Sequence, residues 1–113
     1  MEMKTIAADE SITHVALEGR LDLAGARSIE LSFAALVCGR RKPALIDLSK
    51  VSFLASYGIR VLVGGAKSLH ANGAKLVLLK PQAQVLQTLR LASLLELIPV
   101  EEDEAKARAL LGG

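Results

Sequence analysis

Apolar residues recur along this chain with two different spacings, and their alternation predicts an α/β fold. Short apolar runs and period-two alternation predict strands, whereas recurrence every three to four residues predicts helices. Strands are expected over Met3–Ala8, Ile12–Glu18, Ala44–Asp47, Lys75–Leu79 and Leu97–Val100. Helices are expected over Ala24–Gly39, Ser56–Ala71, Gln82–Leu91 and Glu102–Leu111, with a turn or short helical extension at Ser93–Glu96. The predicted order is therefore β-β-α-β-α-β-α-β-α.

The connections between these elements predict a mixed sheet. The turn residues Asp9-Glu10-Ser11 separate the first two strands, which favours an antiparallel hairpin. Each later strand is followed by a helix, and such crossovers are right-handed and join parallel strands. We expect a central sheet of four to five strands with about four helices. A chain of 113 residues has room for one core, so a single domain over residues 1–113 is predicted.

The stretch from Asp47 to Val63 organises the rest of the chain. A buried strand ends at Asp47, a polar turn is expected at Leu48–Lys50, and an apolar return follows at Val51–Leu54. Ser56 then stands where a helix N-cap is expected. As a cap, its replacement by alanine would cost about 1 kcal/mol. As a phosphate acceptor, it would carry its charge at the positive end of a helix. The residues alone favour the cap and leave the acceptor role open.

Composition and charge exclude several classes of protein. Hydrophobic residues make up 51% of the chain and aromatic residues 3%, so the core must be aliphatic. The net charge is +2, from 14 basic and 12 acidic side chains, which gives no electrostatic case for binding nucleic acid. No apolar run approaches the roughly 18 residues of a membrane span. Because the N-terminus also lacks the layout of a signal peptide, we expect a cytoplasmic protein without membrane insertion.

No arrangement of residues predicts catalysis or a bound cofactor. Cys38 is the only cysteine and is interpreted as a small core residue. His14 and His70 lie far apart and have no acidic or cysteine companions at ligand spacing, so a metal site is not expected. Gly64-Gly65 lies inside a predicted helix and is not a phosphate-binding loop. Asp22 is interpreted as the cap of the helix that follows it.

Two segments together resemble the STAS domain of bacterial anti-sigma-factor antagonists, a domain that also occurs in transporters. The first is Gly19-Arg20-Leu21-Asp22. The second runs Ile46-Asp47-Leu48-Ser49-Lys50-Val51-Ser52-Phe53-Leu54-Ala55-Ser56-Tyr57-Gly58-Ile59-Arg60-Val61-Leu62. Either segment alone would be weak, but the combination is fairly specific. The resemblance covers nearly the whole chain, including Asn72-Gly73-Ala74-Lys75-Leu76 and the apolar ending Leu94–Val100.

The resemblance implies a protein–protein switch rather than an enzyme. An unmodified antagonist binds a serine-kinase anti-sigma factor and so releases a sigma factor; the kinase then phosphorylates a serine, and the complex dissociates. By position that serine corresponds to Ser56, and a phosphatase would reset the cycle. We expect the partner to contact Arg20, Asp22, Phe53, Leu54, Ala55, Tyr57, Gly58 and Arg60. A monomer or weak dimer is expected, without a cofactor.

One departure from the family pattern keeps alternatives open. The family usually has an acidic residue before the serine and a small polar residue after it, whereas this chain has Ala55 and Tyr57. Tyr57 is interpreted either as packing over the helix start or as an aromatic anchor for the partner. A second interpretation makes the chain a constitutive accessory subunit of a membrane lipid-transport ATPase, with no phosphorylation cycle. A third, a small-molecule or nucleotide sensor, has no supporting residue pattern.

Overall fold

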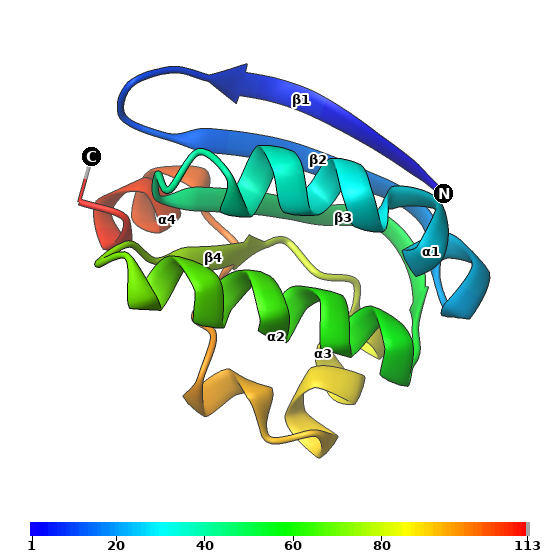
Figure 1. Cartoon of the computed structure of the whole chain (residues 1–113). Helices are drawn as coiled ribbons and strands as arrows, with labels where there is room; N and C mark the ends of the chain where they lie inside the picture. Colours follow the sequence, from blue (N-terminus) through cyan, green and yellow to red (C-terminus); the bar gives the residue numbers. More distant parts are fainter. Residues whose placement is uncertain (113) are drawn as a thin grey trace.

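The computed structural model describes residues 1–112, and its centre is a five-stranded sheet (Figure 1). The strands are β1 (Glu2–Ala8), β2 (Thr13–Leu21), β3 (Ala44–Leu54), β4 (Leu76–Leu79) and β5 (Val100–Glu101). The helices are α1 (Leu23–Phe33), α2 (Ser56–Ala71), α3 (Ala83–Leu91) and α4 (Glu104–Leu110), with a π-helical turn η1 (Ala34–Cys38) and a 3-10 turn η2 (Leu94–Glu96). Gly113, the last residue of the predicted domain, lies outside the described residues.

The sheet has the predicted mixed topology. Its strand order is β1-β2-β3-β4-β5. β1 pairs with β2 in the antiparallel sense, and every other neighbouring pair is parallel. The predicted element order and the α/β fold class are both confirmed.

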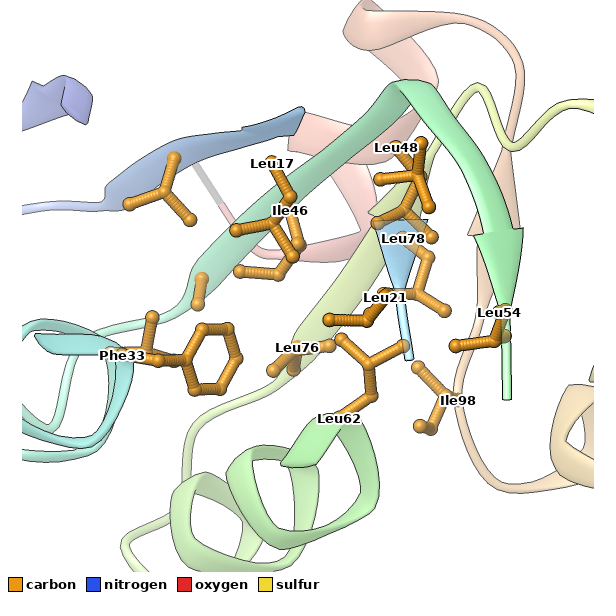
Figure 2. Close-up of a cluster of buried hydrophobic side chains, with 14 of the residues drawn as sticks. Leu17, Leu21, Phe33, Ile46, Leu48, Leu54, Leu62, Leu76, Leu78 and Ile98 are labelled. Carbon is orange, nitrogen blue, oxygen red and sulfur yellow. The ribbon is translucent and has the colours of Figure 1, made fainter. Parts of the chain in front are cut away.

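Helices cover the sheet on both faces. α1 and α2 lie side by side across one face (Figure 1), where aliphatic strand residues meet Phe33 and Leu62 (Figure 2). A smaller cluster on the other face joins Ile12 and strand residues to Ala107 and Leu111 of the α4 segment. Phe33 is the only ring among the buried residues of the two clusters in residues 1–112. The core is therefore aliphatic, as the composition requires.

Two strands are longer than the sequence predicts, because bulges absorb the polar residues that suggested turns. β3 continues through the predicted turn at Leu48–Lys50, and its register against β2 shifts between Ala16 and Glu18 and again after Gly19. The Asp47 carboxylate accepts the N–H of Ser49 at 2.8 Å, which holds the first irregularity in place. The predicted turn at residues 48–50 and the predicted strand end at Glu18 are both wrong.

The remaining boundaries follow local signals. Gly73 has φ +75° directly after the Asn72 cap of α2, as the Asn-Gly pair predicts. The last strand is shorter than predicted and begins only after Pro99, which has no N–H to donate to a sheet. α3 runs beside the far half of β3, where Gln82 Nε2 donates to the Ser49 carbonyl at 2.9 Å. This contact lies at the part of the β3 edge that β4 does not reach, because β4 pairs only with Ala44–Asp47 of β3.

Candidate functional site

The ends of β2 and β3 bring the two resemblance segments together. Because the strands are parallel, both reach the same edge of the sheet, and Arg20 pairs with Phe53 and Leu21 with Leu54. The Ala55 N–H donates to the Leu21 carbonyl at 3.1 Å. α1 begins directly after the first strand end and α2 directly after the second. The site therefore combines two strand ends and two helix N-termini.

Ser56 is not the N-cap of α2, so that prediction is wrong. The cap is Ala55, whose extended backbone has φ −122° and ψ 176° and whose side chain cannot cap. Ser56 is the first residue of the helix and is exposed. Within residues 1–112 its hydroxyl forms no hydrogen bond that would hold the helix start. Ala55 continues the extended backbone one residue past Leu54 and takes the cap position, although its side chain cannot make the capping bond that would identify it in the sequence.

The position of Ser56 suits an anionic group. The first bond within α2 runs from the Ile59 N–H to the Ala55 carbonyl at 3.0 Å. The N–H groups of the three residues before Ile59 have no partner within the helix, and the helix dipole places partial positive charge there. No acidic residue occupies the first turn of α2. A phosphate on this serine would meet a favourable helix end without a carboxylate in that turn.

Arg20 and Phe53 form an exposed stacked pair beside this helix start. The Arg20 guanidinium carbon lies 4.3 Å from the centroid of the Phe53 ring, and Phe53 is 38% exposed. Arg20 Nε also lies 3.4 Å from Asp22 Oδ2. An aromatic ring and a guanidinium that remain open to solvent are side chains that protein interfaces favour.

Asp22 performs the capping role that the sequence predicts. Its Oδ1 accepts the Gly25 N–H at 2.9 Å at the start of α1. This backbone hydrogen bond, with a smaller contribution from Arg20, lowers the pKa of Asp22 below its ordinary value. The carboxylate is thus held by the fold and by Arg20 at the same time.

Tyr57 is half-buried against the core and is held by α1. Its hydroxyl donates to the Glu30 carboxylate at 3.3 Å, and the Arg60 guanidinium carbon lies 5.6 Å from its ring centroid. Sequence reasoning missed Glu30, which lies 27 residues away and belongs to no local motif. Only the side-by-side packing of α1 and α2 brings the two residues together.

Two predicted contact residues lie beneath the surface instead. Leu54 is 4% exposed, and Gly58 is buried. A Cβ at Gly58 would lie 2.4 Å from the Leu21 carbonyl oxygen, so only glycine lets α2 approach β2 this closely. Their predicted contact with a partner is therefore corrected: both position the site without presenting a side chain on it. Ala55 is partly exposed, and Arg60 is exposed.

The remaining chemistry-bearing residues lie away from this edge. His14 is 3% exposed and neither ring nitrogen has a hydrogen-bond partner among the described residues. Burial lowers its pKa, against an opposing effect of Glu104. Across residues 1–112, no three His, Cys, Asp or Glu side chains gather as metal ligands would. None of the helices described there has the length and apolar character needed to cross a membrane.

Comparisons with known proteins bear on the family and the fold. BtrV of Bordetella bronchiseptica, which is named as an anti-sigma factor antagonist, is 28% identical over 93 residues, or 82% of this chain and 80% of BtrV. The crystal structure of the Thermotoga maritima protein TM1081, similarly named, has a TM-score of 0.85 at 18% identity and covers 99% of this chain and 94% of that one.

The third similar protein has been solved in two forms. SpoIIAA, an anti-sigma factor antagonist of Bacillus, has a TM-score of 0.80 at 17% identity in its unphosphorylated form, covering 99% of this chain and 98% of SpoIIAA. The phosphorylated form has a TM-score of 0.71 at 15% identity, covering 96% and 99%. At these identities the solved structures establish a common fold. The STAS domain family model matches residues 3–107. With this match over most of its length and the shared fold, the chain belongs to the STAS domain family.

Proposed function

We propose that this chain is an anti-sigma factor antagonist whose binding to a serine-kinase anti-sigma factor is controlled by phosphorylation of Ser56. In the unmodified state it occupies the kinase, and a sigma factor is released. The kinase transfers the γ-phosphoryl group of ATP to the Ser56 hydroxyl, whose proton is lost, and ADP leaves. A phosphatase hydrolyses the phosphoserine and restores the unmodified protein. The chain itself catalyses neither step.

The observation that carries this proposal is the freedom of the Ser56 hydroxyl. Ala55 is the N-cap of α2, so Ser56 is not needed to cap the helix. Its side chain is instead exposed on the first turn, three residues after Phe53, which stacks on Arg20, and directly before Tyr57, which contacts Glu30. The capping interpretation that competed with the acceptor role has therefore lost its support.

The physics of the switch follows from the two environments of a phosphate. A phosphoserine carries about −1.5 to −2 charges at neutral pH. In the free protein this charge lies at the positive end of α2 and in contact with water. In the complex, a partner covering Phe53 and Tyr57 would have to strip water from the same group. Desolvating an unpaired charge is costly, so phosphorylation disfavours the complex more than it disfavours the fold.

The comparisons support this function over the accessory-subunit alternative. BtrV and TM1081 are named as anti-sigma factor antagonists, and SpoIIAA has been solved in a phosphorylated form. Ala55 in place of the usual acidic residue is compatible with the switch. With alanine at this position, no negative side chain stands directly before the phosphate in the chain. The positive end of α2 attracts the phosphate whether or not an acidic residue is present.

The acceptor role is tested by intact mass after incubation with a purified candidate kinase and Mg-ATP. The wild-type protein is expected to gain one phosphate, and the Ser56→Ala variant none. Ser52→Ala is the matched control, because Ser52 is exposed four residues earlier on β3. It is expected to be modified like wild type. Equal modification of wild type and Ser56→Ala would place the acceptor elsewhere and refute the assignment of Ser56.

A further inference from the structure

A hollow lies at the far end of α2 from Ser56, between the last turns of that helix and the segment that joins η2 to β5 (Figure 1). It consists of two adjoining parts of about 260 and 160 Å³, and both are lined by Ala66, His70 and Leu97. Together the two parts lie near the lower end of the size range of small-molecule sites, about 300–1,000 Å³. Only a small ligand would fit.

The lining of this hollow is mostly apolar and includes a large exposed side chain. Apart from His70 and two lysines, it consists of aliphatic residues: Ala66, Ala71, Ala74, Leu76, Leu97 and Pro99. Leu97 follows η2 and is 54% exposed, whereas Leu94 and Ile98 on either side of it are buried. The Leu97 N–H donates to the Leu94 carbonyl at 3.0 Å, which fixes this turn. The turn therefore presents Leu97 to the hollow rather than to the core, and an apolar ligand chain would cover it.

The charge at the rim of the hollow is positive. Lys67 lines one part and Lys75 the other, and neither forms an ion pair within residues 1–112. No acidic side chain is among the described residues that line the two parts; Glu96 precedes Leu97 in the chain but does not line them. A hollow lined by charge of one sign attracts ligands of the opposite sign. The rim therefore complements an anionic group.

The end of α2 does not by itself explain these basic residues. A cation in the last turn of a helix favours the helix dipole, and this accounts for His70. Lys75 lies beyond the helix, directly before β4, where no dipole calls for it. The last carbonyls of α2 are also paired. The Leu69 carbonyl accepts the Ala74 N–H at 2.8 Å, and the next carbonyl accepts the Gly73 N–H at 3.0 Å. This pairing reduces the repulsion that a helix C-terminus exerts on an anion.

We propose that this hollow binds a small anionic amphiphile of the medium-chain fatty acid class. The carboxylate would lie at the rim with Lys67 and Lys75, and the alkyl chain would lie against Leu97 and Ala66. Burial of the chain supplies affinity, and the lysines select the charge of the head group. The site is at the opposite end of α2 from Ser56, and its occupancy does not depend on the proposed phosphorylation.

The first test titrates the free wild-type protein with octanoate and follows its backbone N–H signals by NMR. Saturable shifts are expected at residues 66–71 and at Leu97. Hexanoate, which is shorter by two methylenes, should bind about tenfold more weakly, because each buried methylene changes affinity about fourfold. Octylammonium has the same chain as an octyl carboxylate but the opposite charge, and it should also bind at least about tenfold more weakly than octanoate.

The second test reverses the charge of the rim. Lys67 and Lys75 are both exposed, so the double variant Lys67→Glu/Lys75→Glu should keep the thermal midpoint of wild type. Its affinity for octanoate is expected to fall at least about tenfold. Lys106→Glu is the matched control, because Lys106 is an exposed helical lysine on α4 that does not line the hollow. It should bind octanoate like wild type.

Three results would overturn the proposal. They are the absence of saturable shifts in wild type, equal affinity for octanoate and octylammonium, and unchanged octanoate binding by the folded double variant. The comparison of head groups uses wild type alone, so it decides the question even if the double variant is unstable. No kinase takes part in these measurements, so their failure would leave the proposed role of Ser56 unaffected.

Discussion

At the scale of single residues, the site contains a carboxylate, Asp22, and a hydroxyl, Ser56. Each lies at the start of a helix, but their structural roles are opposite. Asp22 caps α1 through the Gly25 N–H, whereas Ser56 begins α2 without capping it. Asp22 is built into the fold, whereas Ser56 makes no capping bond and is the proposed phosphoacceptor. The effects of replacing the two residues can be compared directly, because each residue follows the end of one of two neighbouring parallel strands.

Replacing the two residues by alanine should therefore have unequal effects on stability. Asp22→Ala removes a cap and is expected to lower the free energy of unfolding by about 1 kcal/mol. Ser56→Ala is expected to change it by less than about 0.5 kcal/mol, as for a surface position. Urea unfolding of both variants at neutral pH measures the difference. An equal loss in the two variants would mean that Ser56 stabilises the helix start after all.

At the scale of elements, the sequence predicted which segments are strands and helices better than it predicted their ends. Helical spacing over residues 56–71 located α2 correctly, and Asn72-Gly73 marked its end. The polar run at Leu48–Lys50 indicated a turn, because a bulge and a turn use the same residue types. Only pairing with β2 distinguishes the two, and pairing is a long-range property.

The candidate site was affected by the same limitation. Its location was predictable, because parallel strands followed by helices bring Arg20 and Phe53 to one edge. The cap of α2 was misassigned by one residue because the actual cap is an alanine, which gives no capping signal, next to a serine, which does. The contact between Tyr57 and Glu30 joins two helices, and no local pattern contains it. The burial of Gly58 likewise depends on how closely α2 approaches β2.

The burial of His14 is expected to make stability depend on pH. His14, on β2, is buried with both ring nitrogens unpaired, and the charged groups that act on it are Glu104 and Arg108 of α4 and Asp47 of β3. Burial, the largest cause, holds its pKa in the folded protein below the ordinary value of 6.5. The unfolded chain therefore binds a proton more readily, and stability should fall as pH decreases below about 6.5.

The measurement is urea unfolding at pH 7.5 and pH 5.5 for wild type and His14→Leu. The wild-type midpoint should decrease more than that of the variant, which has no ionisable group at this position. Asp9 and Asp22 also have lowered pKa values, but they start from 3.8 and do not titrate in this interval. The same decrease in both proteins would contradict the assignment to His14.

At the scale of the whole molecule, the proposed binding surface and the α4 face are separate. The surface consists of the Arg20–Phe53 pair at the strand ends and of Ser56 and Tyr57 in the first turn of α2. The opposite face is closed by α4, through Ala107 and Leu111. The proposed phosphorylation of Ser56 would therefore change charge at one edge and leave both buried clusters intact, as a switch based on binding requires.

The most direct test compares the affinity of one kinase for the unmodified protein and for the protein phosphorylated at Ser56. Titration calorimetry would be carried out with a non-hydrolysable ATP analogue, so that no phosphate is transferred during the measurement. We predict that phosphorylation weakens binding by at least about tenfold, or about 1.4 kcal/mol. The thermal midpoint of the free protein should change little. Equal affinity of the two forms would contradict the switch and favour a fixed docking subunit.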